Sequence, residues 1–255
     1  LKDYLLKYTT FVRPGATLSI EPGTRILGDS DTKAVLVVQP GGRLLAVGTP
    51  DRPIVFTSER PEGQRRAGDW GGVILLGNAP TNWRTQTGAP KRGRVEGIVE
   101  GGEYGGDSPN DDSGVLSYVR IEYAGTEIGP NNEVNGLTLA GVGRGTRLDH
   151  IQVRAAADDC FEFFGGTVDA HHLICQGTGD DAFDWDNGYQ GRLQFLVAVF
   201  DPREPSVGGN GMEGDNDARG SVFSPVSRPV IYNATLCGTQ RGEQHEHYGI
   251  LARRS

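Results

Sequence analysis

Two stretches of this chain repeat one pattern of residues at a fixed interval. The segments DDCFEFFGG (residues 158–166) and DDAFDWDNG (residues 180–188) align when the sequence is shifted by 22 residues. The same shift aligns Ile151 with Leu173 and Phe195, so apolar positions fall on apolar positions. A fixed period of this kind is the signature of a solenoid, in which each coil buries its apolar side chains against the next coil.

The rest of the sequence contains many short apolar runs and almost no helical periodicity. Runs typical of β-strands are separated by Pro-Gly, Gly-Gly and Asn-Gly pairs, and the chain contains 39 Gly and 14 Pro. This pattern fits either a sandwich or barrel of antiparallel strands or a solenoid of short parallel strands. A sandwich has no reason to keep a fixed register. We therefore predict an all-β fold, a right-handed parallel β-helix (three-sided β-solenoid) of about eight to ten coils.

Three polar, glycine-rich and aperiodic segments interrupt the repeat, at residues 59–69, 78–112 and 201–220. We interpret them as long loop insertions, which in solenoids often form the binding surface. Trp83 and Tyr104 lie in the second segment, where exposed aromatic side chains could bind the face of a sugar. No linker divides the chain, so residues 1–255 are predicted to form a single parallel β-helix domain, a fragment of a longer chain.

Acidic residues recur in register with the aromatic residues of the repeat. Side chains alternate across a strand. We expect four aromatic side chains to point inward: Phe161, Phe163, Phe183 and Trp185. The side chains expected to point outward are those of Cys160, Glu162, Ala182, Asp184 and Asp186.

A third acidic coil is predicted in the segment GMEGDND, which contains Glu213 and Asp215. Glu213 lies 29 residues after Asp184, which is one period plus a seven-residue insertion. We therefore expect Glu162, Asp184 and Glu213 to stack in a column on one outer face, with Asp186 and Asp215 beside them.

Like charges on adjacent strands repel, so this column needs compensation by a bound cation, a shared proton or solvation. Oxygen ligands suit Ca²⁺, which predicts a calcium site made of Glu162, Asp184, Asp186, Glu213 and Asp215. Neighbouring coils lie about 4.8 Å apart, and carboxyl pairs at about 5–9 Å perform glycoside hydrolysis. The alternative is therefore a catalytic role for Asp184, Glu162 and Asp186.

The paired aspartates that open each repeat have two interpretations. Asp158, Asp159, Asp180 and Asp181 either cap backbone amides at a corner of the coil or contribute to a ligand-binding site. The spacing alone does not decide between these roles.

The histidines give a weaker signal. His150, His171 and His172 lie in or beside β-type runs and are interpreted as ordinary surface or hydrogen-bonded residues. His245 and His247 stand two residues apart, so one strand could present both, but no third metal ligand is evident.

The chain has three cysteines, Cys160, Cys175 and Cys237, with no CxxC metal pair. An odd count this low is no disulfide framework. One bridge with one free thiol and no bridge at all both remain open.

The segments FVRPGATLSIEPGTRILG, GRLLAVGTPDRPIVFTSE and GDWGGVILLG, followed by the acidic repeats, resemble a known family. It comprises bacterial secreted or outer-surface right-handed parallel β-helix proteins of the pectin-lyase-like fold, mostly uncharacterised exported proteins and lipoproteins. The resemblance implies the fold and an extracytoplasmic location, and it implies no established reaction. The stretch ADDC is also similar to the paired aspartates of polygalacturonase-type glycosidases, but their GHG and RIK partner motifs are missing.

These observations predict a secreted or cell-surface structural and ligand-binding module. Its expected partner is a polysaccharide or cell-surface glycan and its expected cofactor is Ca²⁺, with a polysaccharide lyase or glycoside hydrolase as the alternative. The net charge of −8 argues against nucleic acid as the main partner. No run approaches the roughly 20 apolar residues of a membrane-spanning helix, so we expect no such segment.

Overall fold

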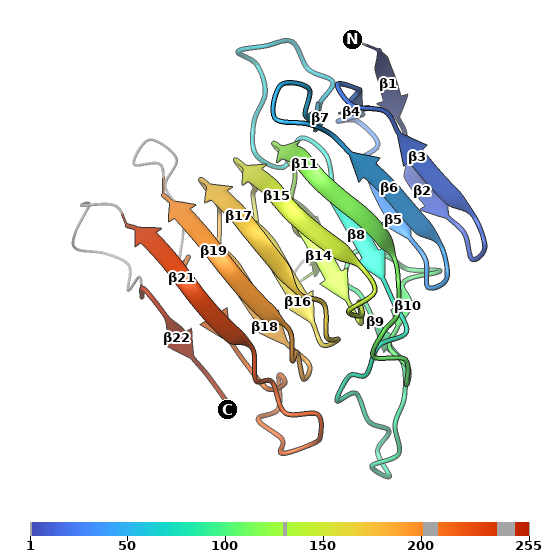
Figure 1. The fold of residues 1–255 in the computed structure, drawn as a ribbon, viewed down its shortest axis with the longest axis vertical. Coiled ribbons are helices and arrows are strands. Elements are labelled where there is room, and N and C mark those ends of the chain that lie inside the picture. Colours follow the sequence, from blue (N-terminus) through green and yellow to red (C-terminus); the bar gives the residue numbers. More distant parts are fainter. Residues whose placement is uncertain (1, 130–131, 201–208, 239–247, 255) are drawn as a thin grey trace.

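The computed structural model describes residues 2–129, 132–200, 209–238 and 248–254. Within these ranges the chain forms strands, turns and loops, and it contains no helix that could cross a membrane. Most strands belong to two large sheets whose neighbouring strands run parallel, and the coils stack along one axis (Figure 1). The predicted all-β parallel β-helix is confirmed.

The chain alternates between the two large sheets as it winds. The first sheet, here called sheet A, consists of β1 (Asp3–Leu6), β3 (Thr17–Ile20), β4 (Arg25–Gly28), β6 (Arg43–Val47), β7 (Ile54–Ser58), β11 (Gly114–Glu122), β15 (Arg147–Arg154), β17 (Ala170–Gln176), β19 (Arg192–Val199) and β21 (Val230–Cys237). The second, sheet B, consists of β2 (Thr9–Val12), β5 (Val35–Val38), β8 (Gly72–Leu76), β14 (Leu137–Ala140), β16 (Phe161–Phe164), β18 (Phe183–Asp186), β20 (Glu213–Gly214) and β22 (Leu251–Ala252). Two short antiparallel pairs lie in loops: β9 (Gly93–Arg94) with β10 (Glu103–Tyr104), and β12 (Thr126–Gly129) with β13 (Asn132–Val134).

Sheet A folds at a corner and so supplies two of the three sides of the solenoid. The first half of β11 pairs with β6 and the second half with β7, and Tyr118 between them has a φ of 51°. A positive φ is uncommon for residues other than glycine. It recurs at the same corner in the four following coils, at His150, His172, Phe195 and Asn233. This column of left-handed residues marks where each coil turns from one side of sheet A to the other.

The register agrees with the predicted repeat in most positions. Phe161 pairs with Phe183, and Ile151 pairs with Leu173. The alignment of Leu173 with Phe195 is wrong, because Leu173 pairs with Leu196. One extra residue in the turn between β18 and β19 shifts the register, and Phe195 falls on the exposed corner instead.

The core fills the inside of the coils. Phe161, Phe163 and Phe183 are fully buried and Trp185 packs against them, as predicted. The outward orientation predicted for Cys160 and Ala182 is wrong, because both side chains are fully buried. These two residues precede β16 and β18, and side-chain alternation holds only within a strand.

A disulfide joins Cys160 to Cys175 inside the core, and Cys237 is an exposed free cysteine. The bridge closes a loop of 15 residues within one coil. Replacing both bridged cysteines by alanine should lower the free energy of unfolding by about 3 kcal/mol. Denaturant unfolding would measure this, with Cys237→Ala as the control that should change little. Equal stability of the two variants would contradict a structural role for the bridge.

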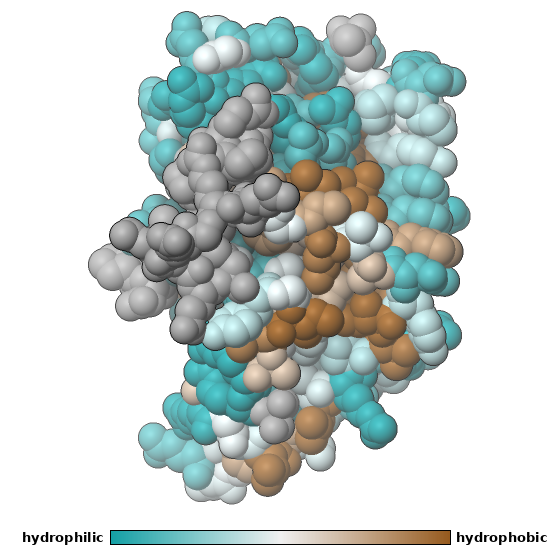
Figure 2. Space-filling model, turned by 90° about the vertical axis from the view of Figure 1, so that its left-hand side faces the viewer, coloured by the Kyte–Doolittle hydropathy of each residue, from teal (hydrophilic) through white to brown (hydrophobic). Residues whose placement is uncertain are grey.

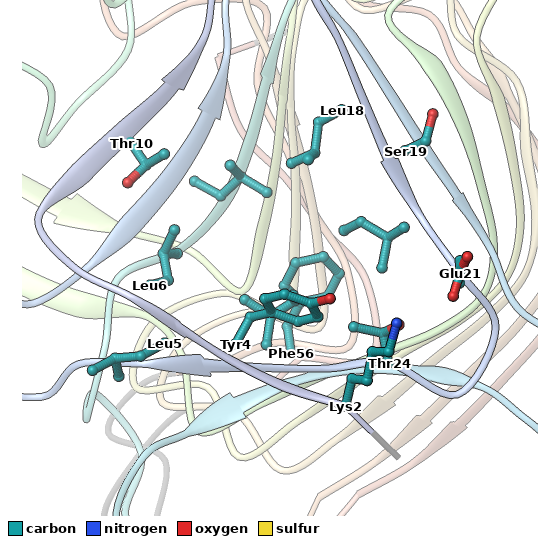
Figure 3. A pocket seen from close by; sticks show the side chains of 13 residues that line it. Lys2, Tyr4, Leu5, Leu6, Thr10, Leu18, Ser19, Glu21, Thr24 and Phe56 are labelled. Atoms are coloured by element: carbon teal, nitrogen blue, oxygen red, sulfur yellow. The ribbon is translucent and has the colours of Figure 1, made fainter.

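The two end coils expose apolar surface. At the first coil, a cavity of about 470 Å³ opens among side chains of β1, β3 and β4 and reaches Phe56 (Figure 3). At the other end, Val230, Tyr232 and Ile250 are exposed. Figure 2, which faces the side with β21 and β22, shows hydrophobic side chains in a strip between hydrophilic margins. Stacked coils bury their apolar faces only against neighbours, so both ends of the described stack remain uncovered.

Candidate functional site

The insertion at residues 78–112 covers the first half of the outer face of sheet B. Val95, Ile98 and Tyr104 from the insertion pack with Val37 and Ile74 in a second apolar cluster, outside the main core. The insertion is therefore a packed cover and not a free loop. Tyr104 is only 1% exposed, so its predicted exposure is wrong.

Beyond this cover the outer face of sheet B becomes acidic. Thr138 pairs with Glu162, Glu162 with Asp184, and Asp184 with Glu213. The predicted column therefore exists in the register, and Asp186 stands two residues beyond Asp184 on the same strand. The three carboxylates of the column are only partly exposed, so solvation alone does not relieve their repulsion.

A ladder of side-chain oxygens runs beside the column, at the corners that precede β14, β16, β18 and β20. Asn135 Oδ1 accepts the Asp159 N–H at 3.2 Å, and Asp159 Oδ1 accepts the Asp181 N–H at 2.8 Å. Asp181 Oδ1 then accepts the Asn210 N–H, and Asn210 Oδ1 accepts the Tyr248 N–H at 3.0 Å. The capping interpretation of Asp159 and Asp181 is confirmed.

Asp158 and Asp180 do not belong to this ladder. Asp180 is exposed and Asp158 is partly exposed, and carboxylate oxygens of both lie within 4.8 Å of one another and of Asp159. Glu133, on β13, adds a further negative charge near Asp158. The two aspartates of each pair thus have different surroundings, one inside the corner and one outside it.

Three carboxylates from two coils converge at the centre of the acidic face. Oxygens of Asp159, Glu162 and Asp184 all lie within 4.8 Å of one another. Asn135 Nδ2 donates to Glu162 Oε2. Asp184 Oδ1 is buried and accepts no hydrogen bond from any described residue. We call Asp159, Glu162 and Asp184 the carboxylate triad. A buried carboxylate oxygen without a hydrogen-bond donor, among like charges, has the chemistry of a ligand for a hard cation.

Burial and mutual repulsion favour the protonated forms of these groups. Burial, followed by the charge of a neighbouring triad carboxylate, raises the pKa of Asp159 and Glu162 well above its usual value. Burial, with the charges of Asp181 and Glu213, does the same for the pKa of Asp184. Protonation or a bound cation would each relieve the repulsion within the triad.

The far end of the column already has cationic partners. Arg253 Nη1 forms an ion pair with Glu213 Oε1, and Arg254 Nε donates to Asp215 Oδ1 at 2.9 Å. Burial still raises the pKa of Glu213 above its usual value, against the lowering effect of Arg253. The five predicted calcium ligands are therefore not equivalent, and the unpaired charge is concentrated at the triad.

Trp83, Tyr104 and Asp186 line one pocket of about 310 Å³ beside the acidic face. Trp83 Nε1 donates to Tyr104 Oη at 2.7 Å, which fixes the indole at the wall. Phe164 adds a further aromatic wall, and Arg84 adds a positive charge. Burial raises the pKa of Asp186 to about 6. Aromatic walls with a few charged groups are typical of small-ligand sites.

Three contributors to the acidic face were absent from the sequence prediction: Asn135, Glu96 and Glu133. Asn135 stands 24 residues before Asp159, so an asparagine in near-register with the aspartates was its signal. Glu96 and Glu133 arrive from the insertion and from the β12–β13 hairpin, and no repeat predicts their position.

The comparisons with known proteins agree with this architecture. No curated protein matches the sequence. The family described as pectate-lyase like beta helix domain matches residues 1–254, and this match covers almost the whole length of the solenoid. The chain belongs to the pectate-lyase-like β-helix domain family.

Proposed function

We propose that this chain is a glycan-binding β-helix module of an exported bacterial protein, with Ca²⁺ bound at the carboxylate triad. The observation that carries the proposal is Asp184 Oδ1, which is buried without a hydrogen-bond donor among two further carboxylates. Ca²⁺ takes six to eight oxygen ligands, so backbone carbonyls or water complete the shell. A bound Ca²⁺ would tie two adjacent coils together and offset the repulsion along the column.

Ca²⁺ should raise the melting temperature of the wild-type protein at neutral pH. An ion present at about 100 times its dissociation constant adds about 3 kcal/mol, which is about 5 °C or more for a chain of this size. Asp184→Asn should remove most of this increase, because it removes a charged ligand at the centre of the triad. The measurement is thermal unfolding against added Ca²⁺, after treatment with chelator.

The matched control is Asp51→Asn, the same chemical change at an exposed position away from sheet B. It should keep the full response to Ca²⁺. A melting temperature that does not depend on Ca²⁺, or an equal loss of response in both variants, would refute the calcium site.

The glycan component rests on the pocket formed by Trp83, Tyr104 and Asp186. A sugar presents an apolar face to an aromatic ring and hydroxyl groups to charged side chains, and this pocket offers both partners. Its walls come from the insertion, from the ends of β16 and β18 and from the segment at residues 217–223, so a ligand there would lie next to the acidic face.

Trp83→Ala should weaken binding to any polysaccharide that the wild-type protein retains in affinity electrophoresis. We expect up to about a tenfold loss, the usual contribution of one aromatic contact. Tyr8→Ala, which removes an exposed aromatic side chain from the N-terminal end, should bind as the wild type does. No binding across a panel of neutral and uronate-containing polysaccharides would argue against a glycan partner.

The location outside the cytoplasm is supported by the disulfide between Cys160 and Cys175. Disulfides persist in oxidising compartments and are rare in the cytosol of most organisms.

The second candidate is a glycoside hydrolase or polysaccharide lyase that uses Asp184, Glu162 and Asp186. It is favoured by the raised pKa of Asp184 and by that of Asp186 at about 6, because a general acid must be protonated near neutral pH. Release of reducing or unsaturated sugars by the wild type, abolished in Asp186→Asn, would establish this alternative over simple binding.

A further inference from the structure

A cluster of histidines surrounds one buried carboxylate at the left-handed corner of sheet A, away from the acidic face of sheet B. Asp149 and His150 lie on β15, and His171 and His172 lie on the neighbouring β17. Asp149 pairs with His171 in register, so the four side chains form two rows, one on each coil.

The side-chain nitrogens converge on one oxygen. Asp149 Oδ1 lies 2.7 Å from Nδ1 of His150, 2.8 Å from Nδ1 of His171 and 3.0 Å from Nδ1 of His172. The Nδ1 atoms of His171 and His172 are 3.1 Å apart. Asp149 is 7% exposed, whereas the imidazole rings reach solvent, so an ion could enter from outside.

The corner conformation creates this convergence. In a regular strand His171 and His172 would point to opposite faces. His150 and His172 instead have φ values of 52° and 57°, which turns both rings to the outside next to their neighbours. The rings also form a stack, since the ring centroid of His150 lies 4.4 Å from that of Tyr118 and 4.3 Å from that of His172.

Hydrogen bonds leave one of these nitrogens, His150 Nδ1, without a partner among the described residues. A neutral imidazole carries one N–H, so Nδ1 either donates or accepts. His150 Nδ1 is buried and makes no hydrogen bond of acceptable geometry, although Asp149 Oδ1 is close. If His171 and His172 both donate to Asp149 Oδ1, their Nδ1 atoms lie 3.1 Å apart around this single acceptor oxygen.

We propose that Asp149, His150, His171 and His172 form a binding site for a divalent transition-metal ion of the zinc class. Zinc binds histidine nitrogen and carboxylate oxygen at about 2.0–2.2 Å with four ligands, which places ligand atoms about 3.3 Å apart. The ligand atoms of Asp149, His150 and His172 all lie within 4.8 Å of one another. His171 Nδ1 lies beside Asp149 and His172 but outside this group, so its ring must rotate toward His150 to complete the four ligands. Three nitrogen ligands select zinc, nickel or copper over calcium.

The second oxygen of the carboxylate is left for another partner. Arg147 Nη2 lies 3.7 Å from Asp149 Oδ2. A metal on Oδ1 and a guanidinium near Oδ2 would orient the carboxylate from both sides. Because the ligands come from two coils, the ion would connect β15 to β17 and stabilise their stacking.

The test is zinc titration by calorimetry, with cobalt absorption spectra as a second readout, on chelator-treated protein. We expect one zinc ion per chain at this site and visible cobalt bands of four-coordinate type. Three substitutions copy residues at equivalent positions of neighbouring coils: His150→Tyr from Tyr118, His171→Gln from Gln194 and His172→Phe from Phe195. They keep the ring stack and the corner while removing ligands. Each should lower zinc affinity by at least about tenfold.

The three substitutions are also combined in one triple variant. If that variant does not fold, His171→Gln alone provides the test, because His171 is outside the left-handed corner. Asp184→Asn should leave zinc binding unchanged, which separates this site from the calcium site. No zinc binding by the wild type would overturn the proposal. Unchanged affinity in the triple variant would do the same, and would place the zinc elsewhere, for example at His245 and His247, which lie outside the described residues.

Discussion

Replacing Phe183 by alanine should lower the free energy of unfolding by about 3–5 kcal/mol. Its ring is fully buried and stacks on Phe161 with 5.4 Å between ring centroids and planes 12° apart. The rings belong to adjacent coils, so truncation leaves a cavity where the two coils meet. Collapse around this cavity is limited because the backbone amides of both coils are already paired with each other. Denaturant unfolding monitored by circular dichroism would measure the loss.

The same chain offers a matched control for this substitution. Phe195 is an equally large ring, but it sits on the outer corner and is 42% exposed. Phe195→Ala should lower the free energy of unfolding by about 1 kcal/mol or less, mainly because it removes the stacking of Phe195 on His172, whose ring centroids are 4.8 Å apart. If the two substitutions cost the same, the internal aromatic ladder is not what stabilises the stack.

The fold could be predicted because the sequence repeat corresponds to the stacking of successive coils in three dimensions. A residue 22 positions ahead is also the neighbour in the next coil, as the pairing of Phe161 with Phe183 shows. The register of Glu162, Asp184 and Glu213 followed for the same reason, even across a seven-residue insertion. Where one extra residue enters a turn, as between β18 and β19, nothing in the sequence marks it, and the prediction for Phe195 failed.

The burial of the insertion could not be predicted from the repeat. Residues 78–112 have no periodicity, and their few apolar residues, such as Val95 and Ile98, give a weak signal. Those residues become a cover only by packing against the outer face of sheet B, which is a tertiary contact. The burial of Tyr104 follows from that packing.

The sequence did not predict the histidine cluster, because His150, His171 and His172 were interpreted as ordinary surface or hydrogen-bonded residues. The alternation rule gives no hint of it either, since it places His171 and His172 on opposite faces of a strand. The left-handed corner overrides the rule, and four of its five residues, Tyr118, His150, His172 and Phe195, are not the usual glycine or asparagine. Conversely, the capping role of Asp159 and Asp181 was one of the two interpretations that the sequence left open, because Asp next to a turn commonly accepts backbone N–H groups.

The metal-free protein should be more stable near pH 5 than near pH 8. Burial, followed by the charge of Asp180, raises the pKa of Asp158 and Asp181 to about 7. In the unfolded chain these groups titrate near 4, so between about pH 4 and 7 the folded state binds more protons. The stabilisation from protonation is complete below this window and is lost as pH rises through about 7. For one buried group such as Asp181, the full effect is on the order of 4 kcal/mol.

Asp159→Asn separates the effect of the Asp159 charge on stability from the effect of the hydrogen bond that its side chain accepts in the ladder. Asn135 and Asn210 occupy equivalent ladder positions and accept backbone N–H groups in the same way, so asparagine preserves the cap. Without the charge, repulsion with Glu162 falls. The metal-free variant should therefore be more stable than the wild type near pH 8, with a shallower decline between pH 5 and 8. Asp51→Asn, at an exposed position, should leave the decline unchanged.

Calcium should reverse the decline of stability with rising pH, because it binds the ionised carboxylates that repel one another in its absence. Its stabilising effect should be greater near pH 8 than near pH 5, and smaller in Asp159→Asn than in the wild type at both. One substitution would then stabilise the metal-free protein and destabilise the calcium-loaded protein relative to the wild type. A purely structural cap predicts no such change of sign, since asparagine satisfies the same backbone amide with or without the ion. Thermal unfolding of both proteins at the two pH values, with chelator and with Ca²⁺, shows whether the Asp159 charge serves to bind a cation or whether the side chain serves only to cap the backbone amide.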